Sequence, residues 1–125
     1  MLGRGFLKLH PYLDDVMDEL AEQQDGVAER LIEINGSPIS TYEEVLEETN
    51  VPDQVGSWDL SMEERFQLIV NAYKQLRDDY ERGIKISEDE GDNSTNDLLI
   101  AYHTAVEKRI WMMSAELGKR PGEGE

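Results

Sequence analysis

The stretch that decides the fold is residues 6–35, FLKLHPYLDDVMDELAEQQDGVAERLIEIN. Apolar side chains recur along it at steps of three, four or seven residues, which is the period of an amphipathic helix with one buried stripe. Pro11 favours a helix start close to itself, because proline is tolerated best in the first turn. The apolar residues Phe6, Leu7 and Leu9 continue the pattern upstream, which leaves the start open by several residues. Asn35 and Gly36 end the pattern, and Pro38 follows. The stripe consists of Leu13, Val16, Met17, Leu20, Val27, Leu31 and Ile34.

Two pairs of metal-capable side chains lie on this helix. His10 and Asp14 are four residues apart, as are Asp25 and Glu29, so the members of each pair share a face. The pairs are separated by almost three whole turns, so all four side chains project in roughly the same direction. Asp14 and Asp25 are about 16 Å apart along the axis, whereas metal–ligand bonds measure about 2.0–2.2 Å. One copy of the helix therefore cannot bring both pairs to one ion.

A second copy of the helix, running antiparallel about a two-fold axis, could complete the site. Positions 10 and 29 are symmetric about the same midpoint as positions 14 and 25. The axis would therefore set His10 and Asp14 of one chain opposite Glu29 and Asp25 of the other. This is an isologous dimer, in which the same surface serves both subunits. It would contain two identical sites, each with one imidazole and three carboxylates drawn from both chains.

The competing interpretation is a solvated acidic face. The chain has 28 Asp and Glu residues among 125. Such a composition gives about six acidic pairs at i, i+4 by chance, and these pairs usually mark an exposed face. A histidine near a helix start is also more often a capping or surface residue. Spacing alone therefore leaves both interpretations open.

Composition limits the class of protein. The length of 125 residues indicates one domain, and no apolar run is long enough for a membrane span or a signal peptide. Without cysteine there are no disulfides or thiolate metal sites, which is compatible with a reducing cytoplasm, the expected location. A formal net charge of −16 argues against binding duplex DNA and suits a surface that attracts cations.

A short helix is expected to follow the first. Ser40 and Glu43 have the spacing of a capping box, which opens a helix to about Glu48. Two turns are unstable alone, so we expect the apolar side chains of this helix to pack on a bundle. The following loop contains one large aromatic residue, which we expect to be a packing anchor. The residues concerned are Tyr42, Val45 and Leu46 in the helix and Trp58 in the loop.

Two further long helices are expected, over about 61–87 and 95–117. Capping-box spacings, a Ser followed three residues later by an acid, precede both. Each carries apolar side chains every three or four residues, as in the seam of a helix bundle. Residues 119–125 have the composition of a disordered tail, so the folded domain is expected at 1–118. The stripes are Phe66, Ile69, Tyr73, Leu76, Tyr80 and Ile84, then Leu99, Tyr102, Val106, Ile110, Met113 and Leu117; the capping pairs are Ser61 with Glu64 and Ser94 with Asp97.

The expected class is therefore all-α, with three long helices and a short one. Bundles normally bury their stripes with four long helices. By this count one long helix is missing from the sequence, or another chain supplies it.

Four segments are specific in combination. They read F-L-x-L-H-P-x-x-D-D at 6–15, A-E-R-L-I-x-I-N-G-S-P-I-S-T at 28–41, D-E-G-D-N-S-T-N-D-L-L at 89–99 and E-K-R-I-W-M-M-S-A-E-L-G at 107–118. Together they resemble the Dps family of ferritin-like mini-ferritins, and most closely the Dps-like peroxide-resistance proteins of streptococci. The resemblance covers nearly the whole chain.

The resemblance implies a fold and an assembly. The expected subunit is a ferritin-like four-helix bundle with a short helix in the middle connection, and twelve-fold homo-oligomers of such subunits form a hollow dodecamer. In the family, a further helix ending in a His-Trp motif comes first, and its histidine is also an iron ligand. We therefore expect residues 1–118 to be a Dps domain that lacks this first helix, with weakened activity as one consequence.

The resemblance also implies an activity. Members of the family oxidise Fe²⁺, preferably with hydrogen peroxide, store the Fe³⁺ as mineral and so protect against oxidative stress. Their ferroxidase site lies at a two-fold interface, in agreement with the spacing argument, and Zn²⁺ could occupy the same ligands. Residue by residue, the catalytic and metal ligands fall on His10, Asp14, Asp25 and Glu29.

A three-fold channel for iron is implied as well, lined by acids near the start of the last helix. Asp97 matches that position, and Asp92 and Asp89 are weaker candidates. We expect His103 to be a packed or surface residue. Trp111 could donate electrons, but core packing is the expected role.

Two other functions are weighed against this one. Some Dps proteins compact DNA through basic tails, but here only Lys119 and Arg120 are basic in the tail. The second alternative is a structural role, in which a shortened chain would be a partner-dependent helical fragment with impaired catalysis.

Overall fold

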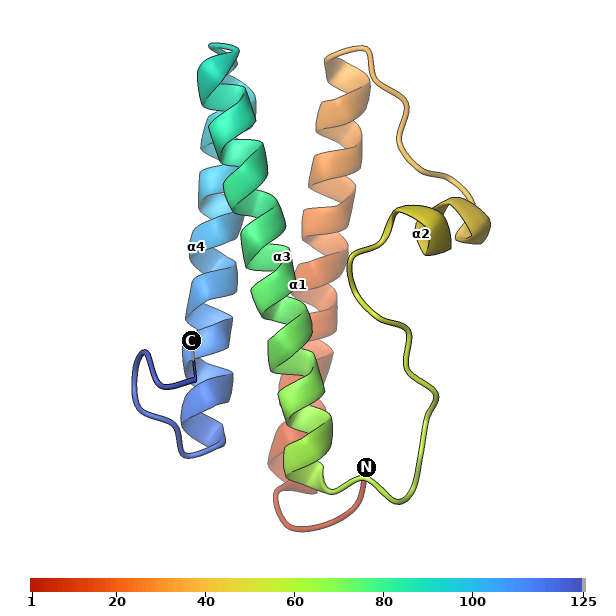
Figure 1. Ribbon diagram of the computed structural model, residues 1–125, viewed down its shortest axis with the longest axis vertical. Coiled ribbons are helices and arrows are strands. Elements are labelled where there is room, and N and C mark those ends of the chain that lie inside the picture. The colour runs from red at the N-terminus through yellow and green to blue at the C-terminus, as the bar shows by residue number, and fades with distance from the viewer. Residues whose placement is uncertain (125) are drawn as a thin grey trace. The chain divides into compact units, whose positions relative to one another are not determined.

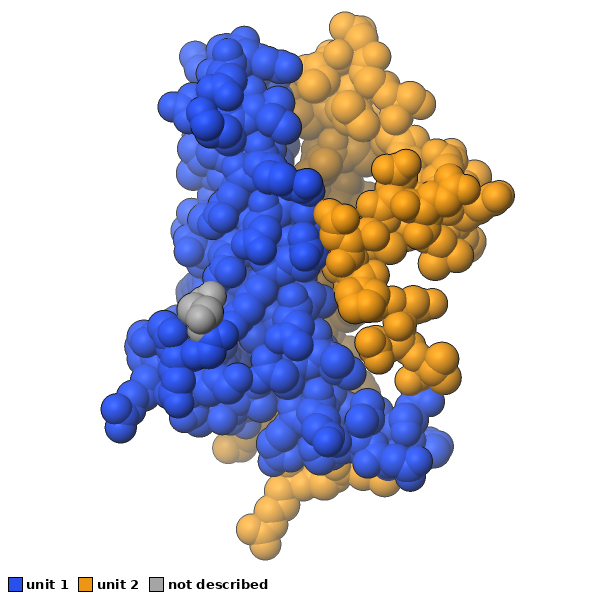
Figure 2. Space-filling model, viewed as in Figure 1, with its two compact units in different colours: residues 1, 56–125 blue, residues 2–55 orange. Residues whose placement is uncertain are grey.

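The computed structural model describes residues 1–124, which form four α-helices and no strand. The all-α class is therefore confirmed. None of the helices in the described part of the chain could span a lipid bilayer. The chain divides into two compact units, one of residues 2–55 and one of residue 1 with residues from 56 onward (Figure 2). The helices are α1 (Phe6–Glu33) and α2 (Tyr42–Glu48) in the first unit and α3 (Met62–Asp89) and α4 (Asn93–Glu116) in the second (Figure 1).

Helix α1 begins at Phe6, at the upstream end of the range that the apolar pattern left open, and not at Pro11. Gly5 precedes it with φ of 94°, a conformation that glycine adopts without steric cost. The Gly5 carbonyl accepts a hydrogen bond from the backbone N–H of Leu9 at 2.8 Å, which starts the helix upstream of the proline. Pro11 removes the donor for the Leu7 carbonyl, but Leu7 is 86% exposed, so water can replace it.

The end of α1 agrees with the expected stop at Asn35 and Gly36. Asn35 has φ of 71°, and the Gly36 N–H donates to the Leu31 carbonyl at 2.7 Å. The buried side chains of α1 form a narrow line at seven-residue steps. They are Leu9, Val16 and Gln23; of the expected stripe, Leu13, Leu20 and Leu31 are half-buried, and Met17, Val27 and Ile34 are exposed. Periodicity shows which side of a helix is apolar, but not how much of that side another element covers.

Helix α2 is capped one residue later than expected. Thr41, not Ser40, is the N-cap: its hydroxyl accepts from the Glu44 N–H at 3.2 Å and donates to the Glu44 carboxylate at 2.9 Å. The run Ser-Thr-Tyr-Glu-Glu offers both frames, which is why spacing alone chose the wrong one. The expected packing of this region is also wrong, because α2 buries no side chain. Tyr42, Val45, Leu46 and Trp58 are 91, 48, 65 and 76% exposed.

Helices α3 and α4 pack against each other as an antiparallel hairpin (Figure 1). The capping box that opens α3 is confirmed, since the Ser61 hydroxyl accepts from the Glu64 N–H and the Glu64 carboxylate accepts from the Ser61 N–H. Helix α4 instead begins at Asn93, where Asp92 is the cap and accepts from the Thr95 N–H at 3.1 Å. Asp92 therefore replaces Ser94 as the capping residue.

The core of the hairpin follows the expected stripes in part. Half of the stripe residues are buried and half are only half-buried, and Val70, outside the expected stripe, is buried too. The buried stripe residues are Phe66, Tyr73, Tyr80, Val106, Ile110 and Met113; the half-buried ones are Ile69, Leu76, Ile84, Leu99, Tyr102 and Leu117. The largest side chains at 1% exposure or less are Phe66, Val70, Val106 and Met113, from both helices. Close approach is possible at Gly83, where an added Cβ would lie 2.8 Å from the Leu99 side chain. Trp111 is 56% exposed, so its expected packing in the core is wrong.

The tail is partly described. Residues 121–124 form turns, and the Lys119 ammonium donates to the Gln67 side-chain carbonyl at 2.7 Å. Glu125 lies outside the described residues. The expected boundary after residue 118 and the disorder of the tail stay predictions.

A buried tyrosine makes the stability of the fold depend on pH in the alkaline range. Burial raises the pKa of Tyr80 well above its ordinary value, and the neighbouring Tyr102 and Tyr73 add to this shift. The folded chain therefore keeps the Tyr80 proton above about pH 10, where the unfolded chain releases it. We expect the free energy of unfolding to fall with pH above about 10, and less steeply in Tyr80→Phe. Urea unfolding at several alkaline pH values measures the slope, with exposed Tyr42→Phe as control; equal slopes in both variants would contradict the assignment.

Candidate metal centre

Helix α1 presents the first pair of candidate ligands near its start. His10 and Asp14 are both exposed, with 59 and 69% of their side chains accessible, and the His10 Nδ1 lies 3.6 Å from an Asp14 carboxylate oxygen. The Phe6 ring meets the imidazole edge to face, with centroids 5.2 Å apart. This contact restrains the ring while a carboxylate stays beside it, an arrangement that can bind a divalent cation.

The second pair lies near the end of the same helix. Asp25 and Glu29 are exposed, and neither makes a hydrogen bond or an ion pair with any residue that the structure describes. Two carboxylates one turn apart without a neutralising cation concentrate negative charge at this position. Such a pair is suited to binding a cation from solution.

One chain does not assemble the four ligands. Within residues 1–124 no three His, Cys, Asp or Glu side chains are grouped so that they could hold a metal ion. The two pairs lie on one continuous helix, so their separation of about 16 Å is set by the helical rise. Helix α1 thus carries two candidate half-sites, and their joining about a two-fold axis stays a prediction.

The acids expected at the iron channel differ in their local roles. The Asp92 carboxylate caps α4 through Thr95, and Asp89 accepts a hydrogen bond from the Lys85 ammonium at 3.0 Å. Asp97, in the second turn of α4, is exposed and has no ionic partner among the described residues. Of the three, Asp97 has the carboxylate most available to a passing cation.

His103 occupies a site that sequence reasoning did not identify. Its Nε2 lies 3.0 Å from the Glu81 carboxylate on α3, and its Nδ1 lies 3.3 Å from that of Glu107 on α4. The side chain is 18% exposed. The two ring nitrogens face different carboxylates. The His103 imidazole therefore bridges the two helices of the hairpin, and the three side chains do not surround one ion. The spacing of His103 and Glu107 was a possible signal, but Glu81 joins them only through the register of α3 on α4.

Known proteins resemble this chain over nearly its whole length. The family of ferritin-like domains matches residues 1–121. The DNA protection during starvation protein of Listeria monocytogenes is 44% identical over 123 residues, 98% of this chain and 79% of that protein. The corresponding protein of Streptococcus suis is 36% identical over 97% of this chain and 70% of its own length. The solved structure of Dps from Listeria innocua soaked with cobalt has a TM-score of 0.95 and 43% identity, over 98% of this chain and 79% of that one.

Proposed function

This chain belongs to the Dps family of ferritin-like proteins, and on that premise we propose that it oxidises Fe²⁺ with hydrogen peroxide and stores the ferric product. The observation that carries the proposal is the pair of half-sites on α1: His10 with Asp14, and Asp25 with Glu29. Solved Dps structures from Listeria innocua were soaked with cobalt and with zinc. Divalent cations of this kind prefer the same imidazole and carboxylate ligands as Fe²⁺.

The ligand set favours oxidation. Three carboxylates and one imidazole bring up to three negative charges to the metal, which stabilise Fe³⁺ more than Fe²⁺ by simple attraction. Asp25 and Glu29 hold the more tightly bound iron, and Asp14 of the other chain completes or bridges that position. His10 holds a second, weaker iron, because a neutral ligand attracts the cation less. Zn²⁺ competes for these positions, since it accepts the same donors.

The reaction balances with two iron ions for each peroxide. Each Fe²⁺ gives up one electron. Hydrogen peroxide accepts both electrons, its O–O bond breaks, and two protons complete two molecules of water. Two adjacent irons deliver the electrons as a pair. Single-electron reduction, which would release hydroxyl radical, is thereby avoided.

The assembly and the charge serve the same function. Isologous dimers about the two-fold of α1 build a larger homo-oligomer, for which the dodecamer of the family is the expected form. A net charge of −16 raises the local concentration of cations. Asp97 marks the channel through which iron reaches the interior, with Asp92 and Asp89 as more distant contributors.

The stoichiometry tests this proposal. We expect the protein, loaded with Fe²⁺ under anaerobic conditions, to oxidise two Fe²⁺ for each hydrogen peroxide added. A spin trap in the same solution should detect no hydroxyl radical above background, whereas free Fe²⁺ without the protein should give a strong signal. One Fe²⁺ oxidised per peroxide, together with trapped radical, would contradict the proposal.

A further inference from the structure

Basic side chains gather at one end of the hairpin. Residues 65–77 of α3 and 108–120, in and after α4, contain seven of the 12 basic residues of the chain and one of its 28 acidic residues. Residues 78–97, at the other end, contain eight acids and two bases. A chain of net charge −16 therefore has one region with a local excess of positive charge. Such a region attracts anions.

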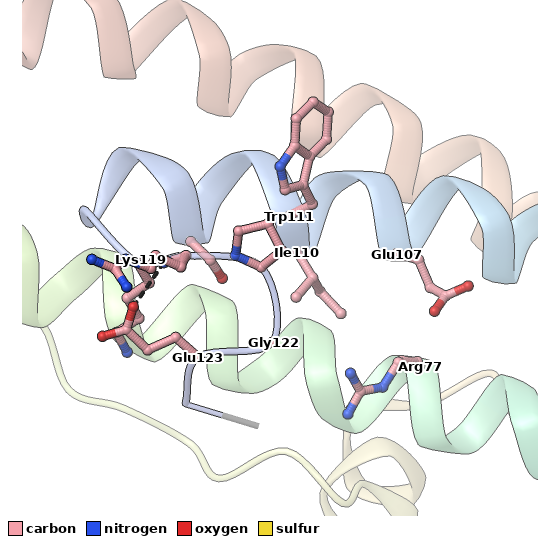
Figure 3. Close-up of a pocket in the computed structure, with 10 residues that line it drawn as sticks. Arg77, Glu107, Ile110, Trp111, Lys119, Gly122 and Glu123 are labelled. Carbon is pink, nitrogen blue, oxygen red and sulfur yellow. Dashed lines mark hydrogen bonds between the residues drawn. The ribbon is translucent and has the colours of Figure 1, made fainter.

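A cavity of about 260 Å³ lies within this region, in the unit that contains α3 and α4. Figure 3 shows Arg77 and Glu107 at one end of it and Lys119 and Glu123 at the other, with Ile110 between them. The cavity is slightly smaller than the usual range for drug-sized ligands, about 300–1,000 Å³. Its lining combines apolar side chains with basic ones, so it suits a small molecule with an apolar body and an anionic group. The apolar residues are Ile110, Trp111 and Pro121, and the basic ones are Arg77, Lys119 and Arg120.

The turns after α4 form one wall of the cavity. The Lys119 ammonium is held on α3 by Gln67 at 2.7 Å, and the Lys74 ammonium of α3 donates to the Gly124 carbonyl at 2.9 Å. Pro121 and Gly122 between these anchors line the cavity. Residues 119–124 are thus attached to α3 at both ends, which gives the cavity a defined shape.

The two carboxylates that line the cavity have partners in the chain. Glu107 faces the His103 Nδ1 at 3.3 Å, and the Glu123 carboxylate accepts from the backbone N–H of Arg120 at 2.8 Å. The Arg120 guanidinium, by contrast, has no ion pair or hydrogen bond with any described residue. A guanidinium without a carboxylate partner is available to a carboxylate or phosphate of a ligand, which it binds by charge-assisted hydrogen bonds.

We propose that this cavity binds a small organic anion. The phosphate or carboxylate group contacts Arg120 and Lys119, and Arg77 adds positive charge from α3. The apolar body rests on Ile110 and Pro121. The site is separate from the half-sites on α1, which bind cations and belong to the other unit.

Phenyl phosphate is a suitable probe, because it combines a dianion with an apolar ring. The full chain with Trp58→Phe has Trp111, which lines the cavity, as its one remaining indole. We expect phenyl phosphate to change the Trp111 fluorescence in a saturable manner. Arg120→Gln should weaken the apparent affinity about tenfold or more, the loss of one charge-assisted contact, and Arg77→Gln should weaken it as well.

Lys108→Gln is the matched control, because it removes the same charge from an exposed position that does not line the cavity. The affinity of Lys108→Gln for phenyl phosphate should equal that of the parent. Absence of a saturable change, or equal weakening by Lys108→Gln, would overturn the proposal. Equally tight binding of inorganic phosphate would show that the apolar wall is unused and would overturn it too. Binding of a single-stranded oligonucleotide through Arg120 and Arg77, without binding of phenyl phosphate, would also overturn the proposal.

Discussion

The double variant Asp25→Ala, Glu29→Ala should oxidise Fe²⁺ with peroxide about a hundredfold more slowly than the parent, or not at all above background. In the proposed site these two side chains are the carboxylates of the more tightly bound iron, and neither has another partner among the described residues. Removing a residue that only supports a metal ligand typically lowers metal affinity or activity about 10–100-fold. Removing two direct ligands should lower the rate at least as much. Absorbance of the ferric product after a peroxide pulse measures the rate.

The matched control removes the same charge from another exposed pair of acids. Glu43 and Glu47 of α2 are also four residues apart and exposed. Glu43→Ala with Glu47→Ala should keep the parental rate, which separates loss of ligands from loss of general negative charge. Both double variants should elute with the parent in size-exclusion chromatography. Parental kinetics in Asp25→Ala, Glu29→Ala would remove the proposed site.

Much of the fold could be predicted from periodicity and capping. The stripe of α3 places Phe66, Tyr73 and Tyr80 in the hairpin, and all three are buried. The Ser61 capping box starts α3 where it was expected. These signals are local: they depend on residues three or four positions apart, which the chain presents in order.

Features that depend on distant parts of the chain could not be predicted in this way. The exposure of Trp111 depends on which face of α4 meets α3, and the bridge at His103 depends on the register that brings Glu81 to it. The basic cavity likewise requires the turns after α4 to reach back to α3 at Gln67. Each needs two elements to be placed relative to one another, and sequence spacing alone does not provide this.

The candidate site is a mixed case. That His10 and Asp14 share an exposed face of one helix with Asp25 and Glu29 could be predicted from spacing, and the continuous helix α1 confirms it. That the two pairs cannot meet within one chain also follows from the rise of a helix. The joining of half-sites between two chains is a property of an assembly, so it stays a prediction.

Complementation between two inactive variants tests that joining directly. One variant carries His10→Ala with Asp14→Ala, and the other carries Asp25→Ala with Glu29→Ala. In a mixed two-fold dimer, the intact pair of the first chain faces the intact pair of the second at one site, whereas the other site loses all four ligands. Each variant alone has no complete site.

Co-expression of the two variants in equal amounts should restore peroxide-dependent iron oxidation to roughly a quarter of the parental rate. Random pairing makes half of the dimers mixed, and one of the two sites in each mixed dimer is complete. If every site were built from a single chain, the mixture would stay as inactive as its components, and iron oxidation at a shared two-fold site would be disproved.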